Sequence, residues 1–223
     1  MTVASVHLAD LGAISAIRSL RGPGAVRGLR HADAAIAAPL SRGRASTPPM
    51  PGRIGLVAFW DDHAALDDFL SSHPYARRLA GGWHARLEAL RAFGDWPGLD
   101  SDVRRHRSTP EHEGWALVTT LGRLRLPQTR RFLRTSRPAE RRALQAPGFI
   151  WGTALARPPF VATVSLWESA DAIAAYAFEG GHPAHPDAIA EDRSKPFHHR
   201  SAFIRFRIVE HAGGLGRRNP LAA

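Results

Sequence analysis

The sequence predicts an α+β protein in which tandem ferredoxin-like repeats form a dimeric α+β barrel-like domain within one chain. Short apolar strands alternate with amphipathic helices along most of its length. The second half follows the order strand, helix, two strands, helix, strand, which is the split β-α-β arrangement. One strand–helix motif also occurs twice, and this recurrence indicates an internal duplication.

The recurring motif is an apolar strand that ends in tryptophan and leads into a helix. Its first copy has the strand Leu56–Trp60, and its second copy has the strand Thr163–Trp167, so the two tryptophans stand 107 positions apart. Asp62 and Ser169 follow these strands, and both residue types are favoured as helix N-caps. The offset is close to half of the chain length, as expected for two similar halves.

The first half is predicted from apolar periodicity and chain breakers. We expect a strand over 2–8, a helix from Asp10 to about Leu20, a strand over 25–29, a loop over 41–52, the motif strand over 54–60, its helix over 62–71, and a strand over 83–93. In the Asp10 helix, Leu11, Ile14, Ile17 and Leu20 are apolar at helical spacing, which is typical of a buried face.

The second half shows the same alternation more clearly. We expect strands over 115–121, 149–155, 160–167 and 201–209, and helices over 127–145, 169–178 and 186–193. Together the elements predict one domain over residues 1–223, with halves at about 1–95 and 114–210, a connector at 96–113 and a C-terminal tail at 211–223.

Composition narrows the possible chemistry. The chain has 223 residues, of which 44% are hydrophobic, enough for a substantial core. It has no cysteine, which excludes disulfides, iron–sulfur clusters, thiolate-ligated haem and thiol nucleophiles. No apolar run is long enough for a transmembrane helix, and no signal-peptide pattern opens the sequence, so we expect a cytoplasmic location.

The formal net charge is +10, but its make-up argues against nucleic-acid binding. Lys195 is the only lysine, so arginine supplies nearly all of the positive charge. The arginines are spread along the chain without a basic arm or interleaved aromatic residues. No nucleic-acid partner is expected.

Several segments resemble the spheroidene monooxygenase family. They are the block 148–161, the strand ending Ser165-Leu166-Trp167, the stretch from His185 to Phe206, and the closing residues 216–221. The resemblance implies a haem-dependent oxygenase on a ferredoxin-like barrel. It further implies a lipophilic, carotenoid-like substrate and an electron donor such as a ferredoxin.

The same resemblance implies that His185 is the axial ligand of the haem iron. The family's histidine stands twenty residues before an arginine, as His185 stands before Arg205 in this sequence. The residues alone leave alternatives open, because histidine, tyrosine and methionine can all ligate haem iron when cysteine is absent. His182 is a competing neighbour, and His182, His185 and one of His198 and His199 could instead form a zinc site.

Three further residues are cofactor-binding candidates, each with a structural alternative. Arg205, also the catalytic candidate, could line the barrel and pair with a haem propionate, or it could face outward on its strand. Trp167 could wall a cavity or simply fill the core. Arg157, in a turn, could pair with a propionate or be solvated.

Two other functions fit the same predicted barrel. One is a cofactor-free monooxygenase of the antibiotic-biosynthesis type, and the other is a non-enzymatic protein that binds haem or another small ligand. Peripheral contact with a membrane and assembly into a homo-oligomer are additional expectations for a basic protein with a lipophilic substrate.

Overall fold

The computed structural model describes residues 2–41, 48–106, 109–179, 196–216 and 218–221. Its centre is a closed barrel of eight strands in the order β1-β3-β2-β6-β7-β5-β8-β4. Every neighbouring pair is antiparallel. The strands are β1 (Val3–Asp10), β2 (Leu29–Pro39), β3 (Arg53–Trp60), β4 (Trp83–Gly94), β5 (Ala116–Leu124), β6 (Phe149–Arg157), β7 (Phe160–Trp167) and β8 (His198–Gly213).

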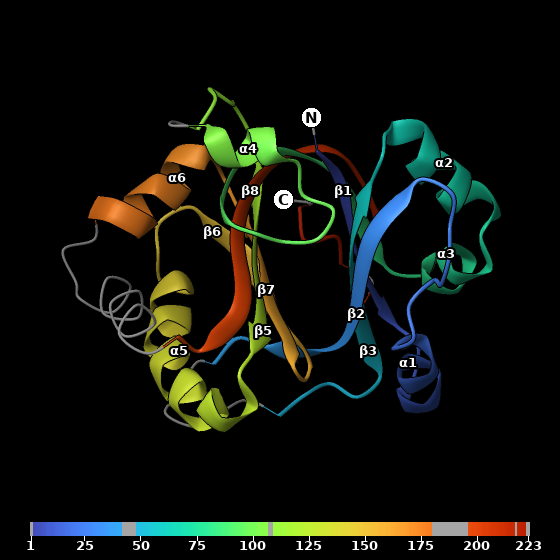
Figure 1. Ribbon diagram of the computed structural model, residues 1–223, viewed down its shortest axis with the longest axis horizontal. Helices are drawn as coiled ribbons and strands as arrows, with labels where there is room; N and C mark the ends of the chain where they lie inside the picture. Colours follow the sequence, from blue (N-terminus) through green and yellow to red (C-terminus); the bar gives the residue numbers. More distant parts are fainter. Residues whose placement is uncertain (1, 42–47, 107–108, 180–195, 217, 222–223) are drawn as a thin grey trace.

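Helices cover the outside of the barrel on two sides (Figure 1). Helices α1, α2 and α3 lie beside the first four strands, and α5 and α6 lie beside the last four. A short helix, α4, belongs to the connector between β4 and β5. The helices are α1 (Ala13–Ser19), α2 (His63–Ser72), α3 (Pro74–Leu79), α4 (Ser101–Arg105), α5 (Thr129–Ala143) and α6 (Ala170–Ala174), with a 3-10 turn at Leu126–Gln128 and a π-helical turn at Ala175–Glu179.

Strand alternation divides the apolar residues into an interior core and two outer cores. The interior core receives side chains from all eight strands, for example Val6 from β1 and Phe206 from β8. The outer core of the first half lies under α1, α2 and α3 and contains Trp60 and Phe69. The outer core of the second half includes Trp167.

The barrel and the order of its strands agree with the sequence prediction, whereas the short helices α3 and α4 were not predicted. Both recurring strands and both N-caps are confirmed, since Asp62 accepts a hydrogen bond from the Ala65 amide and Ser169 accepts one from the Ala172 amide. The second strand is an exception, because it spans Leu29–Pro39 and not 25–29. This alanine-rich segment is a strand because β3 and β6 pair with its two edges, which outweighs a weak local preference.

The first helix also departs from the prediction. Asp10 does not cap it; Asp10 ends β1 and accepts two hydrogen bonds of 2.7 Å from Arg53. The N-cap is Gly12, whose φ of 74° suits glycine. The buried face consists of Ala16 and Ser19, while Ile14 and Ile17 face outward.

The chain beyond residue 210 contributes to the barrel. β8 continues to Gly213, through residues that the sequence assigns to the tail, and Leu221 is buried in the interior core. No helix in the described part of the chain is long and apolar enough to cross a membrane.

Candidate functional site

The outer face of the second half carries two of the residues singled out by the sequence. Trp167 lies here and not inside the barrel. It packs edge-on against Phe149, with ring centroids 5.3 Å apart, and its centroid lies 5.2 Å from that of Tyr176. Its indole Nε1 donates to Ser165 Oγ at 2.9 Å. Trp167 therefore forms an aromatic wall between the sheet and the residues that follow α6.

Arg205 points away from the barrel interior, because its neighbours Ile204 and Phe206 belong to the interior core. The barrel-lining alternative is therefore wrong. Arg205 is nonetheless only 3% exposed, and its guanidinium donates to Thr109 Oγ1 of the connector at 3.0 Å. Burial, and secondly the neighbouring Arg91, lowers the pKa of Arg205. The result is a buried cation beside the apolar face that holds Trp167.

That face is lined by a small set of apolar groups. Val118 on β5 is paired with Arg205 on β8, and Ile173 of α6 is buried in the same cluster as Val118 and Trp167. α5 runs along this side of the barrel (Figure 1), but none of its fifteen described residues is buried. Among the described residues, α5 therefore adds no buried side chain to this face.

Arg157 takes part in a different cluster, inside one end of the barrel. Its guanidinium lies 3.7 Å from the carboxylate of Asp33, and Arg123 donates to the same carboxylate at 3.0 Å. His31 Nε2 lies 2.7 Å from Asp33 Oδ2, and Trp96 Nε1 donates to that oxygen at 3.2 Å. We call these five residues the Asp33 cluster.

The Asp33 cluster keeps a carboxylate charged in an enclosed place. Burial disfavours the ionised form of Asp33, but the hydrogen bonds and charges of its partners, His31 first, outweigh burial and lower its pKa. Asp33 and Arg123 were not among the residues predicted from the sequence to be functional. The available signal was the spacing of His31 and Asp33, which puts both on one face of a strand.

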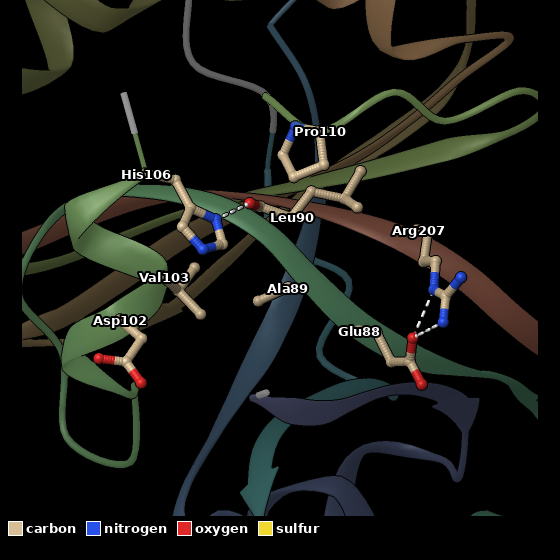
Figure 2. Close-up of a pocket in the computed structure, with 8 residues that line it drawn as sticks. All are labelled: Glu88, Ala89, Leu90, Asp102, Val103, His106, Pro110 and Arg207. Carbon is tan, nitrogen blue, oxygen red and sulfur yellow. Dashed lines mark hydrogen bonds and ion pairs between the residues drawn. The ribbon is translucent and has the colours of Figure 1, made fainter. Parts of the chain in front are cut away.

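A pocket of about 340 Å³ lies outside the barrel, where β4 meets β8 and the connector covers them (Figure 2). Glu88 and Arg207 form an ion pair at its edge, and His63 Nε2 lies 2.8 Å from the second Glu88 oxygen. Burial opposes ionisation of Glu88, but the hydrogen bonds with His63 and Arg207 lower its pKa. Across the pocket, His106 Nδ1 donates to the Leu90 carbonyl at 2.8 Å.

His185 lies outside the described residues, as do the competing His182 and the expected helix at 186–193. The π-helical turn at Ala175–Glu179 precedes that segment in the sequence and β8 follows it. Within the described residues, no group of three or more histidine, aspartate or glutamate side chains could hold a metal ion.

Comparisons with known proteins give a sequence relative and several solved structures with a similar fold. No family profile matches the chain. Spheroidene monooxygenase from Rubrivivax gelatinosus is 30% identical over 164 residues, which make up 71% of this chain and 61% of that protein. The chain thus spans less than two thirds of the length of this relative. The similarity agrees with the resemblance found in the sequence motifs.

Two of the solved structures with a similar fold are aldoxime dehydratases. The first, OxdRE in complex with butyraldoxime, has a TM-score of 0.54 at 12% identity, covering 93% of this chain and 79% of that one. The second has a TM-score of 0.50 at 12% identity, covering 93% and 81%. At this identity the comparison shows a shared fold and nothing about chemistry.

Proposed function

We propose that the chain is an oxidative enzyme of the monooxygenase type that uses haem and acts on a lipophilic, carotenoid-like substrate. The observation that carries the proposal is the 30% identity to spheroidene monooxygenase over 164 residues. We also infer that the two halves are duplicated ferredoxin-like repeats. Supporting this inference, Trp60 and Phe69 pair in the first half as Trp167 and Tyr176 do 107 positions later.

We infer that haem would bind at the outer face of the second half. A porphyrin is flat and apolar and carries two carboxylates, so it needs aromatic or aliphatic walls and nearby cations. Trp167, Val118 and Ile173 supply such walls, and the buried Arg205 supplies a cation on the same face. A single axial histidine is enough to hold the iron, and the cysteine-free sequence leaves histidine as the first choice.

In this proposal His185 holds the iron and Arg205 faces a haem carboxylate. Bound haem would supply the redox-active iron at which dioxygen is activated, and a donor such as a ferredoxin would supply the electrons. Trp167 would form the wall of the site on the side of the sheet. In this proposal Arg157 lies outside the site, because its guanidinium is 3.7 Å from the Asp33 carboxylate.

Haem titration of the purified protein tests the ligand assignment. We expect wild type to give a Soret band at one haem per chain and His185→Ala to shift or lose that band. His182→Ala is the matched control, because it removes a neighbouring histidine from the same segment. Loss of the band in His182→Ala but not in His185→Ala would reassign the ligand, and an unchanged spectrum in both variants would refute a histidine-ligated haem in this segment.

The oxygenase activity needs a separate measurement. Haem-loaded protein, a ferredoxin with its reductase, and a linear carotene in detergent are incubated under ¹⁸O₂. We expect an oxygenated carotene that carries one ¹⁸O atom, and its yield should drop at least about tenfold in His185→Ala. Haem binding without any labelled product would instead favour a protein that only binds haem.

A further inference from the structure

Helix α1 buries its small residues and exposes its isoleucines, which is the opposite of the sequence prediction. Ala16 and Ser19 are fully buried against the barrel, whereas Ile14 is 70% exposed and Ile17 is 59% exposed. Burying either isoleucine would stabilise the fold by removing its side chain from water, so their exposure is unfavourable for the isolated protein. Two neighbouring exposed isoleucines on one helix face indicate an interaction surface.

The same face of α1 is basic. Ile14, Ile17 and Arg18 follow the spacing i, i+3, i+4, which lines up side chains on one side of a helix, and Arg21 lies in the turn just after the helix ends at Ser19. Arg18 and Arg21 are exposed, and neither makes an ion pair with a carboxylate among the described residues. Between Asp10 and Asp33 the sequence has four arginines and no acidic residue.

Helix α3 adds further positive charge to this surface. It packs against the end of α1, where Tyr75 donates to the Ser19 carbonyl at 2.7 Å and Arg78 donates to Ser19 Oγ at 3.3 Å. Arg77 and Arg78 are both exposed in the last turn of α3. Figure 1 shows α3 directly beside α1, outside the first half of the barrel. We call Ile14, Ile17, Arg18, Arg21, Arg77 and Arg78 the α1 surface.

We propose that the α1 surface binds the face of an anionic lipid bilayer. Isoleucine side chains can enter the boundary between headgroups and acyl chains while arginines contact the lipid phosphates, which is how interfacial helices bind membranes. Arginine side chains are long enough to keep their guanidinium groups at the headgroups while the helix lies flat on the bilayer. Bilayer binding by α1 is independent of the oxygenase activity, and either property can hold without the other.

A second copy of the chain fits this surface less well. A twofold-symmetric contact through α1 would bring the same arginines of both copies together, and such like-charge contacts are unfavourable. The exposed apolar area also comes from only two side chains, which is small for a stable protein–protein interface. Positive charge around a small apolar centre matches an anionic lipid surface better.

Vesicle flotation tests the proposal with the full-length protein. We expect binding to phosphatidylcholine vesicles that contain about one third phosphatidylglycerol, weak binding to pure phosphatidylcholine, and release at about 1 M NaCl, where the screening length falls to about 3 Å. Ile14→Ser/Ile17→Ser should lose about tenfold or more in binding to the anionic vesicles. Arg18→Gln/Arg21→Gln should lose several-fold.

Matched controls come from β8 in the other half of the barrel. Val209→Ser changes another exposed aliphatic residue, which is 47% exposed, and Arg200→Gln changes another exposed arginine. Both should bind vesicles as wild type does. Thermal melting of every variant checks folding, and little change is expected because all the altered side chains are exposed.

A fluorescent label gives a second, independent measurement. The chain has no cysteine, so Ile17→Cys creates a unique site for a polarity-sensitive dye, and Val209→Cys creates its control. We expect anionic vesicles to raise and blue-shift the emission at position 17 only. Equal responses at both positions, or vesicle binding that Ile14→Ser/Ile17→Ser leaves intact, would overturn the proposal. Self-association that this double substitution abolishes, without vesicle binding, would assign the surface to a second copy.

Discussion

The two outer faces of the barrel have the same strand–helix order but very different packing. Beneath α1, α2 and α3, thirteen buried residues form the first outer core, including Trp60, Leu66 and Phe69. Under α5 and α6, the second outer core contains four buried residues in the described part of the chain, and Trp167 and Ile173 are the largest of them. The indole of Trp60 donates a hydrogen bond to Ser5, and the indole of Trp167 donates one to Ser165. The two equivalent tryptophans are therefore held in the same way but in cores of different size.

From this difference we infer that folding stability and ligand binding depend mainly on different halves of the barrel. A densely packed face contributes apolar burial and has no room for a ligand. The smaller outer core of the second half, as far as the described residues show it, is expected to contribute less to folding. We therefore expect the first half to carry more of the folding free energy, and the second half to be the site of the proposed cofactor.

Matched substitutions in the two helices test this comparison most directly. Phe69→Ala should lower the free energy of unfolding by about 3–5 kcal/mol, because it opens a cavity in a full core. Tyr176→Ala, at the corresponding place in the second half, should cost only about 1–2 kcal/mol, because Tyr176 is partly exposed. Urea denaturation measures both, and equal losses would contradict the proposed division.

The Asp33 cluster ties the halves together, since Asp33 is on β2 and Arg123 is on β5. Asp33→Asn should cost about 3 kcal/mol at neutral pH, because it removes the charge of a buried carboxylate that pairs with two arginines and accepts hydrogen bonds. The lowered pKa of Asp33 means that its contribution is complete above pH 3.8 and is lost as pH falls through the folded-state pKa. The wild-type advantage should therefore shrink in strong acid.

Asp61→Asn is the control for that experiment. Asp61 also pairs with an arginine, Arg30 at 2.8 Å, but its side chain is 58% exposed. Exposed pairs contribute little, so a loss below about 1 kcal/mol is expected. If the two substitutions cost the same, the Asp33 cluster is no stronger than a surface ion pair.

A buried histidine makes the first half sensitive to acid. Burial and, secondly, the nearby His84 lower the pKa of His7 to about 3, far below its ordinary 6.5. Between pH 6.5 and pH 3 the unfolded chain binds a proton at this histidine that the folded chain excludes. The free energy of unfolding therefore decreases by up to about 1.4 kcal/mol for each unit by which the pH is lowered. His7→Gln should flatten this slope between pH 6.5 and 3, whereas His112→Gln should leave it unchanged in urea titrations.

The smallest effect is expected at Arg157. Its side chain is 40% exposed and lies 3.7 Å from Asp33, so Arg157→Gln should change the free energy of unfolding by less than about 1 kcal/mol. Haem binding should also be unaffected, because Arg157 belongs to the end of the barrel and not to the outer face of the second half. A weaker haem complex in this variant would return Arg157 to the proposed site.

Local features of the fold were predictable from the sequence. The strands ending at Trp60 and Trp167 and the caps at Asp62 and Ser169 depend on neighbouring residues, so a local pattern was sufficient. The candidate site was only partly accessible. Arg205 and Trp167 were selected from the sequence, but the face that they share was not, and the ligand role of His185 stays a prediction.

By itself, the sequence determined the order of the elements, the recurrence of the tryptophan motif and the absence of thiol chemistry. Only the tertiary structure decided which side of α1 is buried, that Arg205 points outward, and that Asp33 meets Arg123 and Arg157. The physical reason is barrel closure. It pairs strands that are far apart in the chain, and these pairings, rather than local periodicity, assign each side chain to the interior, an outer core or solvent.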